Sequence, residues 1–371
     1  MALTKYKLGS LLELLDERNS DLKYGIDDVK GISIQKVFIE TKADMAGVSL
    51  KPYILVKPDS FAYVTVTSRN GEKITIAHND TENTYIVSSS YVVFRVSRPD
   101  LMLSDFLFMI FNRPEFDRYA RFNSWGSARE TFSWEEMCDI DIDLPSITVQ
   151  QKYVDIYNSM LANQRCYERG LEDLKLVCFS SIEKHRKKYP LKKIRNYISP
   201  YNEKNIDGRI TLEQGININK VFITPQRSNS NLQGRKIVKH GMFAYCTQLN
   251  NENVAIAFRD GEDCVVSSVY DVFEITKKAE LLPEYLMLWL IRPEFGRFVY
   301  WASEGSAYEF LSYDNLADYE IPIPNITVQK AIGDIYLSYV KRKQLNDRLK
   351  ALIKDLCPIL VKGAVEEGER E

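Results

Sequence analysis

The chain of 371 residues is 45% hydrophobic and 12% aromatic, and its formal net charge is −2. This composition suits two domains of ordinary size with packed cores, and it excludes a disordered chain. The absence of any apolar run of about eighteen residues excludes a membrane-spanning helix. Six scattered cysteines without a C-x-x-C pair, and an N-terminus unlike a signal peptide, predict a cytoplasmic protein with reduced thiols and no metal site.

The first half opens with a short amphipathic segment at residues 8–15. Runs rich in β-branched and aromatic residues then predict strands at 32–39, 53–56, 61–67, 74–77 and 85–96. Apolar residues at helical spacing predict a helix over 103–111. A second helix begins at Arg113-Pro114-Glu115-Phe116, because proline is tolerated in the first helical turn.

A long helix is predicted from Thr148 to about Lys187, a stretch without internal proline. Its apolar residues approximate the heptad spacing of a coiled coil. The predicted seam consists of Val149, Tyr153, Ile156, Met160, Tyr167, Leu174 and Val177.

The second half repeats this order of parts. It has a start at 191–198, strands at 216–223, 237–238, 242–247, 254–258 and 264–275, and a helix at 282–291. A second long helix follows from Thr327, with a seam at Val328, Ile332, Ile335, Tyr339, Leu349, Ile353, Leu356 and Leu360. We expect the two long helices to pair as an antiparallel coiled coil that holds the globular parts apart. The alternative is that each helix packs only on its own domain.

The repetition is a true duplication. Residues 85–157 align with 264–336 without a gap and give 29 identities in 73 positions. The shared motifs include Arg-Pro-Glu-Phe, Gly126-Ser127-Ala128 with Gly305-Ser306-Ala307, and Ile-Thr-Val-Gln at 147–150 and 326–329. The predicted fold is therefore α+β, with two tandem mixed α/β repeats, each followed by a long helix. The predicted boundaries are 1–147, 148–188, 189–326 and 327–371.

No catalytic motif is recognisable in the chain. The phosphate-binding loop G-x-x-x-x-G-K-[ST], the G-x-G-x-x-G fingerprint and the G-x-S-x-G elbow are all missing from the sequence. The three histidines, His78, His185 and His240, do not recur at matching positions, although a duplicated enzyme would repeat its base. The sequence therefore predicts a chain that is not an enzyme by itself.

The two halves diverge most at residues 40–84 and 224–263, which are rich in the polar side chains that read base edges and hold phosphates. Residues 187–260 also carry thirteen Lys/Arg against five Asp/Glu. Ordinary solvated hairpin loops remain the alternative, and a tight turn is the favoured interpretation of Gly-Ser-Ala. The candidate DNA-binding residues are Lys42, Thr67, Ser68, Arg69, Asn70, Lys73, Arg129, Gln226, Arg227, Ser228, Asn229, Asn231, Arg235, Lys236, Gln248, Asn250 and Tyr308.

With its doubled order of parts, each repeat running through Leu-Pro or Ile-Pro-x-Pro and Ile-Thr-Val-Gln into a long helix, the chain resembles the specificity subunits of Type I restriction–modification systems. The resemblance covers essentially the whole chain. It implies two target-recognition domains, each reading one half of a bipartite asymmetric DNA site, with the helices fixing the gap.

The resemblance also implies partners. Two methyltransferase subunits would use S-adenosylmethionine, and motor-endonuclease subunits would use ATP and Mg²⁺, so this chain itself would need no cofactor. The candidate partner-binding residues are Gln150, Lys152, Asp155, Tyr157, Gln329, Asp334 and Tyr336. Two features depart from the expectation, because the net charge is not basic and the first half lacks the basic excess of the second. A non-catalytic scaffold for two copies of a protein partner is the competing hypothesis.

Overall fold

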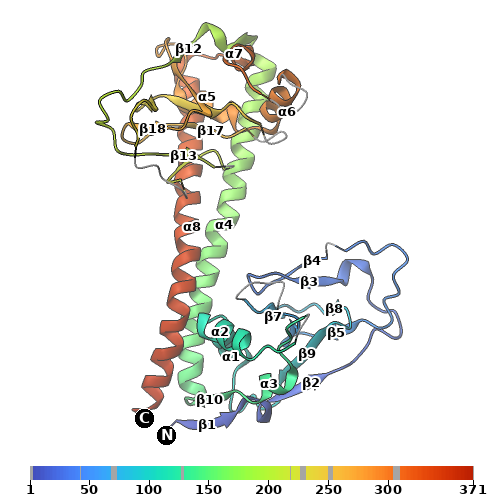
Figure 1. The fold of residues 1–371 in the computed structure, drawn as a ribbon. Helices are drawn as coiled ribbons and strands as arrows, with labels where there is room; N and C mark the ends of the chain where they lie inside the picture. The colour runs from blue at the N-terminus through green and yellow to red at the C-terminus, as the bar shows by residue number, and fades with distance from the viewer. Residues whose placement is uncertain are drawn as a thin grey trace. The chain divides into compact units, whose positions relative to one another are not determined.

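The chain divides into two compact units in the computed structural model, which describes residues 3–41, 43–67, 73–126, 129–217, 219–225, 231–249, 254–303 and 310–370. The first unit comprises residues 1–166 and 346–371, and the second comprises residues 167–345. Each unit contains segments of both long helices, α4 (Ile147–Lys188) and α8 (Ile326–Gly368) (Figure 1). The mixture of helices and antiparallel sheets confirms the α+β class with two long helices. No helix in the described ranges is long and apolar enough to cross a membrane.

The first unit is built on a four-stranded antiparallel sheet in the order β2-β9-β6-β7. The two-stranded ladders β1-β10, β3-β4 and β5-β8 surround it. Its strands are β1 (Thr4–Lys7), β2 (Leu12–Leu15), β3 (Lys30–Ile32), β4 (Phe38–Glu40), β5 (Ile54–Val56), β6 (Ser60–Val64), β7 (Ile76–His78), β8 (Tyr85–Val87), β9 (Tyr91–Val96) and β10 (Asp141–Leu144). Its short helices are α1 (Ser104–Phe111), α2 (Pro114–Phe122) and α3 (Trp134–Cys138).

The second unit repeats this plan. Its four-stranded sheet has the order β12-β19-β16-β17, with the ladders β11-β20, β13-β14 and β15-β18. Its strands are β11 (Leu191–Lys193), β12 (Ile198–Tyr201), β13 (Gly215–Ile216), β14 (Phe222–Ile223), β15 (Lys236–Val238), β16 (Phe243–Cys246), β17 (Ile256–Phe258), β18 (Cys264–Val266), β19 (Tyr270–Ile275) and β20 (Glu320–Pro322). Its short helices are α5 (Pro283–Leu290), α6 (Pro293–Ala302) and α7 (Tyr313–Ala317).

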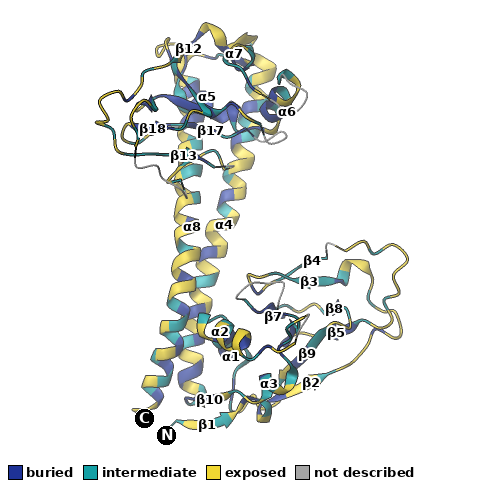
Figure 2. Ribbon diagram, viewed as in Figure 1, coloured by how far each residue is buried: buried dark blue, intermediate teal, exposed yellow. Residues whose placement is uncertain are grey.

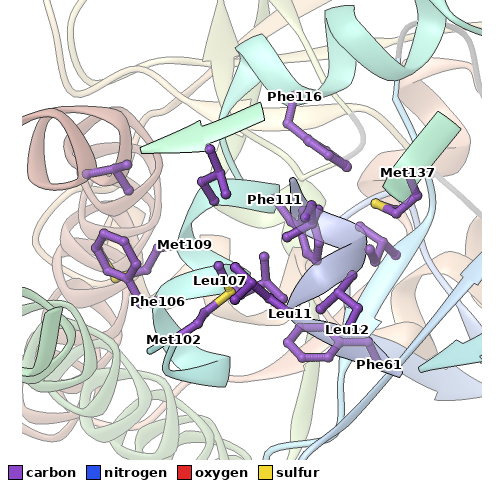
Figure 3. Packing of buried hydrophobic residues seen from close by; sticks show 14 of the residues in the cluster. Leu11, Leu12, Phe61, Met102, Phe106, Leu107, Met109, Phe111, Phe116 and Met137 are labelled. Atoms are coloured by element: carbon purple, nitrogen blue, oxygen red, sulfur yellow. The ribbon is translucent and has the colours of Figure 1, made fainter. Parts of the chain in front are cut away.

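The core of the first unit joins the sheet, the short helices and the ends of the long helices. Phe61 of β6 stacks on Phe94 of β9 at 5.1 Å between ring centroids, and Phe111 of α1 meets Phe61 edge-on at 5.8 Å. Figure 3 shows Phe61 and Phe111 gathered with other buried side chains of this cluster. Tyr157 of α4 and Ile353 of α8 belong to the same core, so the sheet and the long helices share one hydrophobic cluster.

Four predicted strands are in fact pairs of strands. The runs at 32–39 and 216–223 are the hairpins β3-β4 and β13-β14. Their turns contain Lys36 and Lys220, which have left-handed φ angles of 61° and 59°. The runs at 85–96 and 264–275 are likewise divided, into β8 and β9 and into β18 and β19. The β-branched and aromatic residues of these runs outweighed the turn residues at the breaks, among them Ser88-Ser89-Ser90 and Asn217.

The long helices are antiparallel within each unit. In the first unit, Lys152 Nζ pairs with Glu367 at 2.7 Å, and Gln164 Nε2 donates to Asn346 Oδ1 at 3.0 Å, so rising numbers on α4 meet falling numbers on α8. In the second unit, Ile182 shares a core with Ile332. Figure 2 shows the buried residues of α4 and α8 along one side of each helix and exposed residues along the other.

The predicted seam of α4 is partly wrong: Val149 is buried, and Tyr153 and Met160 pack against the core of the first unit. Ile156, Tyr167 and Val177, which were expected in the seam, are 42%, 36% and 48% exposed. The buried heptad series instead contains polar residues, which an apolar pattern does not detect. It runs through Gln150, Tyr157, Gln164, Leu171 and Cys178.

Gly126, in the repeated Gly-Ser-Ala motif, needs to be a glycine. Its φ is +137°, and a Cβ there would lie 2.3 Å from the carbonyl oxygen of Arg129. The backbone folds back on itself at this point, which supports the turn interpretation, although Ser127 and Ala128 lie outside the described residues.

We therefore expect Gly126→Ala to lower the free energy of unfolding by about 1–3 kcal/mol, because it combines backbone strain with a clash. Chemical denaturation of the purified chain would measure it. Gly25→Ala is the matched control, since Gly25 has a φ of −100° and nothing within 4 Å of its Cβ position. Equal effects of the two substitutions would contradict this account of Gly126.

Candidate nucleic-acid interface

The structure describes fewer than half of the predicted DNA-binding residues. Thr67, Lys73, Arg129, Asn231, Arg235, Lys236 and Gln248 are described. The others lie outside the described residues, and their assignment stays a prediction: Lys42, Ser68, Arg69, Asn70, Gln226, Arg227, Ser228, Asn229, Asn250 and Tyr308.

In the first unit, the chain leaving β6 is fixed to the segment that carries Arg129. The Thr67 backbone N–H donates to the Glu130 carbonyl oxygen at 2.9 Å, and the Thr67 hydroxyl donates to the same oxygen at 3.2 Å. Thr67 is only 3% exposed, so its hydroxyl serves the fold and does not face a ligand. Arg129 is exposed beside it. The structure thus brings Arg129 next to the start of the predicted loop at 68–70.

Exposed aromatic residues lie close to this region and were not predicted. Phe122, the last residue of α2, is 77% exposed, and Trp125 is 62% exposed. In the second unit the repeat places Trp301, near the end of α6, at the position of Phe122, and it is 81% exposed. Exposed rings can stack on bases or anchor a partner protein. The sequence signal was present, because a large aromatic residue stands at this position in both repeats.

In the second unit, two predicted cations are engaged within the chain. Arg235 pairs with Glu213 at 3.7 Å. The Lys236 ammonium donates to the Tyr270 carbonyl oxygen at 3.0 Å and pairs with Asp271. Both lysine and arginine side chains are mostly buried, so they do not present free charge to a ligand.

The two remaining described candidates of the second unit are exposed. Asn231 Oδ1 accepts the backbone N–H of Gln233 at 2.9 Å in a short turn. Gln248 lies just beyond the end of β16 and forms an isolated β-bridge with Phe310. These two side chains are therefore placed at the surface, each at the edge of a stretch outside the described residues.

Much of the basic excess at 187–260 is neutralised inside the second unit. The carboxylates come from outside the segment as well as within it, which a local count of charges cannot show. The ion pairs are Lys193–Asp318, Arg195–Asp314, Arg195–Asp318, Arg209–Glu203 and Lys239–Glu203. Local charge alone is thus a weak guide to the interface.

The repeated Ile-Thr-Val-Gln motif forms an internal clamp. The Gln150 amide donates to the carbonyl oxygens of Leu101 at 2.8 Å and Pro145 at 2.9 Å, and its oxygen accepts the Leu103 N–H at 3.0 Å. Gln150 is fully buried. The clamp ties the beginning of α4 to the segment before α1.

The second unit contains the same clamp. Gln329 Nε2 donates to the carbonyl oxygens of Glu280 at 2.7 Å and Pro324 at 2.8 Å, and its Oε1 accepts the Leu282 N–H at 2.9 Å. Gln150 and Gln329 were predicted to face a partner, but this interpretation is wrong, because both amides are fully buried and saturated within the chain.

The other predicted partner-binding residues divide by exposure. Tyr157 is 8% exposed and packs in the first core, where burial raises the pKa of its hydroxyl, so it too is not a surface residue. Tyr336 is partly buried against the second core. Lys152, Asp155 and Asp334 are exposed. Lys152 pairs with Glu367 and Asp155 accepts the Gln151 amide N–H, and the role of all three residues stays a prediction.

One buried lysine, Lys36, and one half-buried lysine, Lys220, hold the β3-β4 and β13-β14 hairpins against the helices. The Lys36 ammonium donates to the Phe111 carbonyl oxygen and lies 2.8 Å from Asp117, and the Lys220 ammonium donates to the Leu290 carbonyl oxygen. Phe111 and Leu290 occupy equivalent positions in the repeats, but the two lysines are 184 residues apart instead of 179. An ungapped comparison therefore misses this pair.

The two lysines differ in their counter-charge. The position of Asp117 is occupied by a glycine in the second unit, residue 296. Burial lowers the pKa of Lys220 from 10.5 to about 8, and it also lowers the pKa of Lys36, where the Asp117 carboxylate opposes the shift. The second hairpin is thus anchored by an ammonium group without the carboxylate that accompanies Lys36.

His78 is held inside the first unit. Its Nε2 lies 3.0 Å from Asp59 and its Nδ1 lies 3.5 Å from Asp105, while its ring stacks on Phe61 at 4.5 Å. The hydrogen bond from His78 lowers the pKa of Asp59. Among the described residues, no group of three or more His, Cys, Asp or Glu side chains is arranged to hold a metal ion.

Solved specificity (S) subunits of Type I restriction–modification systems share the fold described above. The S subunit of such a system from M. genitalium matches with a TM-score of 0.61 and 10% identity, over 98% of this chain and 96% of that one. The chain therefore has the S-subunit fold.

Two weaker structural matches are of the same kind. A structure described as the basis of complex assembly and conformational transition of the type I R-M system has a TM-score of 0.47 and 12% identity, covering 97% of both chains. The HsdS subunit from Thermoanaerobacter tengcongensis has a TM-score of 0.38 and 13% identity, covering 98% of this chain and 96% of that one. No protein-family model and no curated protein matches the sequence.

Replacing Gln150 by leucine tests the clamp. Gln150→Leu leaves the Leu103 N–H and two carbonyl oxygens buried without partners, and each such group costs about 1–3 kcal/mol. We expect the free energy of unfolding to fall by about 3 kcal/mol or more, measured by chemical denaturation. Gln151→Leu, on the exposed neighbour whose amide donates to Asp155 at 2.7 Å, is the control and should change stability by about 0.5 kcal/mol or less. A tolerated Gln150→Leu would refute the clamp.

Lys220 predicts a pH dependence of stability. Because its pKa in the folded chain is about 8 and its ordinary value is 10.5, the unfolded chain binds more protons between these pH values. The free energy of unfolding of the wild type should therefore rise relative to Lys220→Met as the pH increases from about 8 to 10.5. Urea denaturation across this range would measure the difference. A constant difference would show that Lys220 is not desolvated in the folded chain.

Proposed function

We propose that this chain is the sequence-specific, double-stranded DNA recognition subunit of a Type I restriction–modification complex. Each unit would read one half of a bipartite, asymmetric site, and the two long helices would set the gap between the halves. The observation that carries the proposal is the S-subunit fold over 98% of the chain. The two different polar loop regions on one duplicated frame give it further support, because two different half-sites need different base-reading side chains.

The proposal includes a division of labour with partner subunits. Two modification subunits would transfer methyl groups from S-adenosylmethionine to adenine, and motor-endonuclease subunits would use ATP and Mg²⁺ to cut, all in the cytoplasm. This chain would contribute recognition without catalysis. The duplicated frame supports two modification subunits, because two like units offer two like surfaces. Lys152, Asp155 and Asp334 are the exposed residues that we assign to those contacts.

The test is to map adenine methylation in a host that expresses this chain with its neighbouring modification subunit. We expect methyladenine to appear in one bipartite motif with a fixed unspecified gap. The control host expresses the modification subunit alone and should lack that motif. If the modification subunit is folded and no new methylation appears, recognition is the wrong function, and a scaffold for two protein partners becomes the better hypothesis.

A further inference from the structure

An open groove lies in the first unit between α2, β10 and the last turns of α8. It encloses about 730 Å³. Arg113, the residue before α2, lines it, and we call it the Arg113 groove. Its apolar lining includes Ile110, Ile140 and Pro358. Its rim is acidic, because five carboxylates line it against two cations, which are Arg113 and Lys362.

The second unit shows how the equivalent arginine is satisfied within the chain. Arg292 occupies the position of Arg113, and its Nε donates to Glu294 at 3.1 Å. The Arg292 guanidinium group also pairs with Glu183 of α4 and lies over the Trp289 ring, 4.9 Å from the ring centroid. With these three partners inside the unit, the Arg292 side chain is only 6% exposed.

Arg113 has a different set of neighbours. The repeat places Ile110 at the position of the tryptophan, and it places Lys362 at the position of the α4 carboxylate. Glu115 is retained, but its Oε2 lies 3.5 Å from the Arg113 Nε, which is buried and makes no hydrogen bond to the described residues. A buried donor without an acceptor costs free energy. A ligand that brings an acceptor oxygen to this atom would therefore be favoured.

The second unit also carries larger side chains at three positions of the groove. Trp289, Tyr319 and Phe179 stand where the first unit has two isoleucines and a proline. The offset of 179 residues holds along both long helices, since Cys178 and Cys357 are buried at equivalent positions. The Arg113 groove is thus the space that smaller side chains leave open on a shared frame. An aromatic ring from outside the chain would fill it.

The acidic rim indicates a protein as the occupant, because carboxylates such as Asp143 and Glu369 repel the phosphates of DNA. The groove also continues the surface that we assign to the modification subunits. Glu367, in the same turns of α8, pairs with Lys152 of that surface at 2.7 Å. A segment of a modification subunit is therefore the occupant that the charge and the position favour.

We propose that the Arg113 groove anchors a modification subunit, which inserts an aromatic side chain and presents an acidic residue to Arg113. Basic residues beside this pair would meet the acidic rim. The proposal rests on the proposed function and adds to it an inequality between the two docking surfaces. The second unit fills the equivalent space with its own side chains, so only one of the two modification subunits has this anchor.

The experiment fills the groove with the side chain of the second unit. Purified modification subunit is titrated into the chain, and native mass spectrometry gives the dissociation constants of the first and second bound subunits. We expect Ile110→Trp to weaken one of the two binding steps by about 30-fold or more, which is the usual effect of losing an anchor residue. The other step should be unchanged.

Lys362→Glu is a second variant that does not burden the core, because Lys362 is exposed. It gives Arg113 a carboxylate from the chain itself, as Glu183 does for Arg292, and should weaken the same step by about tenfold. Leu14→Trp is the matched control, because Leu14 is an exposed residue of β2 in the first unit that does not line the groove. Both dissociation constants should stay at the wild-type values in this control.

A photo-cross-linker identifies the inserted segment directly. Ile359 lines the groove and is 62% exposed, so p-benzoylphenylalanine at this position should react with whatever occupies it. We expect a cross-linked peptide of the modification subunit with an aromatic residue within one helical turn of Asp or Glu. Cross-links only to DNA, or only within this chain, overturn the proposal.

Wild-type binding of both subunits by the two groove variants, or equal weakening of both steps, also overturns the proposal. Failure of the proposed function is a different result. In that case the wild-type chain would give no methylation with its modification subunit. If methylation appears and the groove variants bind both subunits as the wild type does, only the anchor is wrong.

Discussion

The buried glutamine clamps are the interaction on which the architecture depends. A primary amide that donates twice and accepts once, without exposure to water, fixes three backbone groups that would otherwise be buried without partners. Gln150 thereby joins the first turns of α4 to the segment that leads into α1, and Gln329 does the same for α8 and α5. The first turns of each long helix are thus fixed to the globular part of their own unit. Any function that requires a fixed spacing between recognition surfaces needs this rigidity where the helix begins.

Repeated identity in this chain marks internal constraint more than shared surface. Besides the glutamines, Asn19 of the first unit and Asn205 of the second make equivalent hydrogen bonds, and both are fully buried. The Asn19 amide donates to the Tyr24 and Leu50 carbonyl oxygens, and the Asn205 amide donates to those of Ile210 and Leu232. These polar groups tolerate few substitutions, because a buried amide without partners is costly. Exposed positions carry no such constraint, so the loops between these fixed points are free to differ. A duplicated frame with different loops follows from the energetics of burial.

The sequence alone was sufficient to predict the elements that depend on composition and on apolar periodicity. The duplication, the α+β class and both long helices could be predicted because long apolar periodicity and ungapped identity are strong signals. The hairpin turns at Lys36 and Lys220 could not be predicted, since the carbonyl oxygens that each ammonium group binds lie far away in the sequence. Part of the seam of α4 was misplaced, because the seam includes Gln164, which pairs with Asn346 far along the chain. Likewise, the cations at 235 and 236 looked available until Glu213 and Asp271 were found beside them.

The charge that the protein presents to a ligand therefore has to be counted after the ion pairs of the folded chain are taken into account. The basic segment at residues 187–260 pairs several of its cations with carboxylates of its own unit, so its excess in the sequence overstates the charge that it presents. The asymmetry extends to single positions, with Asp117 and Lys350 of the first unit replaced by glycine and leucine in the second. Such differences do not disturb the frame, because the clamps and cores are shared. These differences give the two units unequal electrostatic surfaces. A ligand with two unlike halves can therefore bind in one preferred orientation. A duplicated protein that must bind an asymmetric site in one direction needs this kind of inequality.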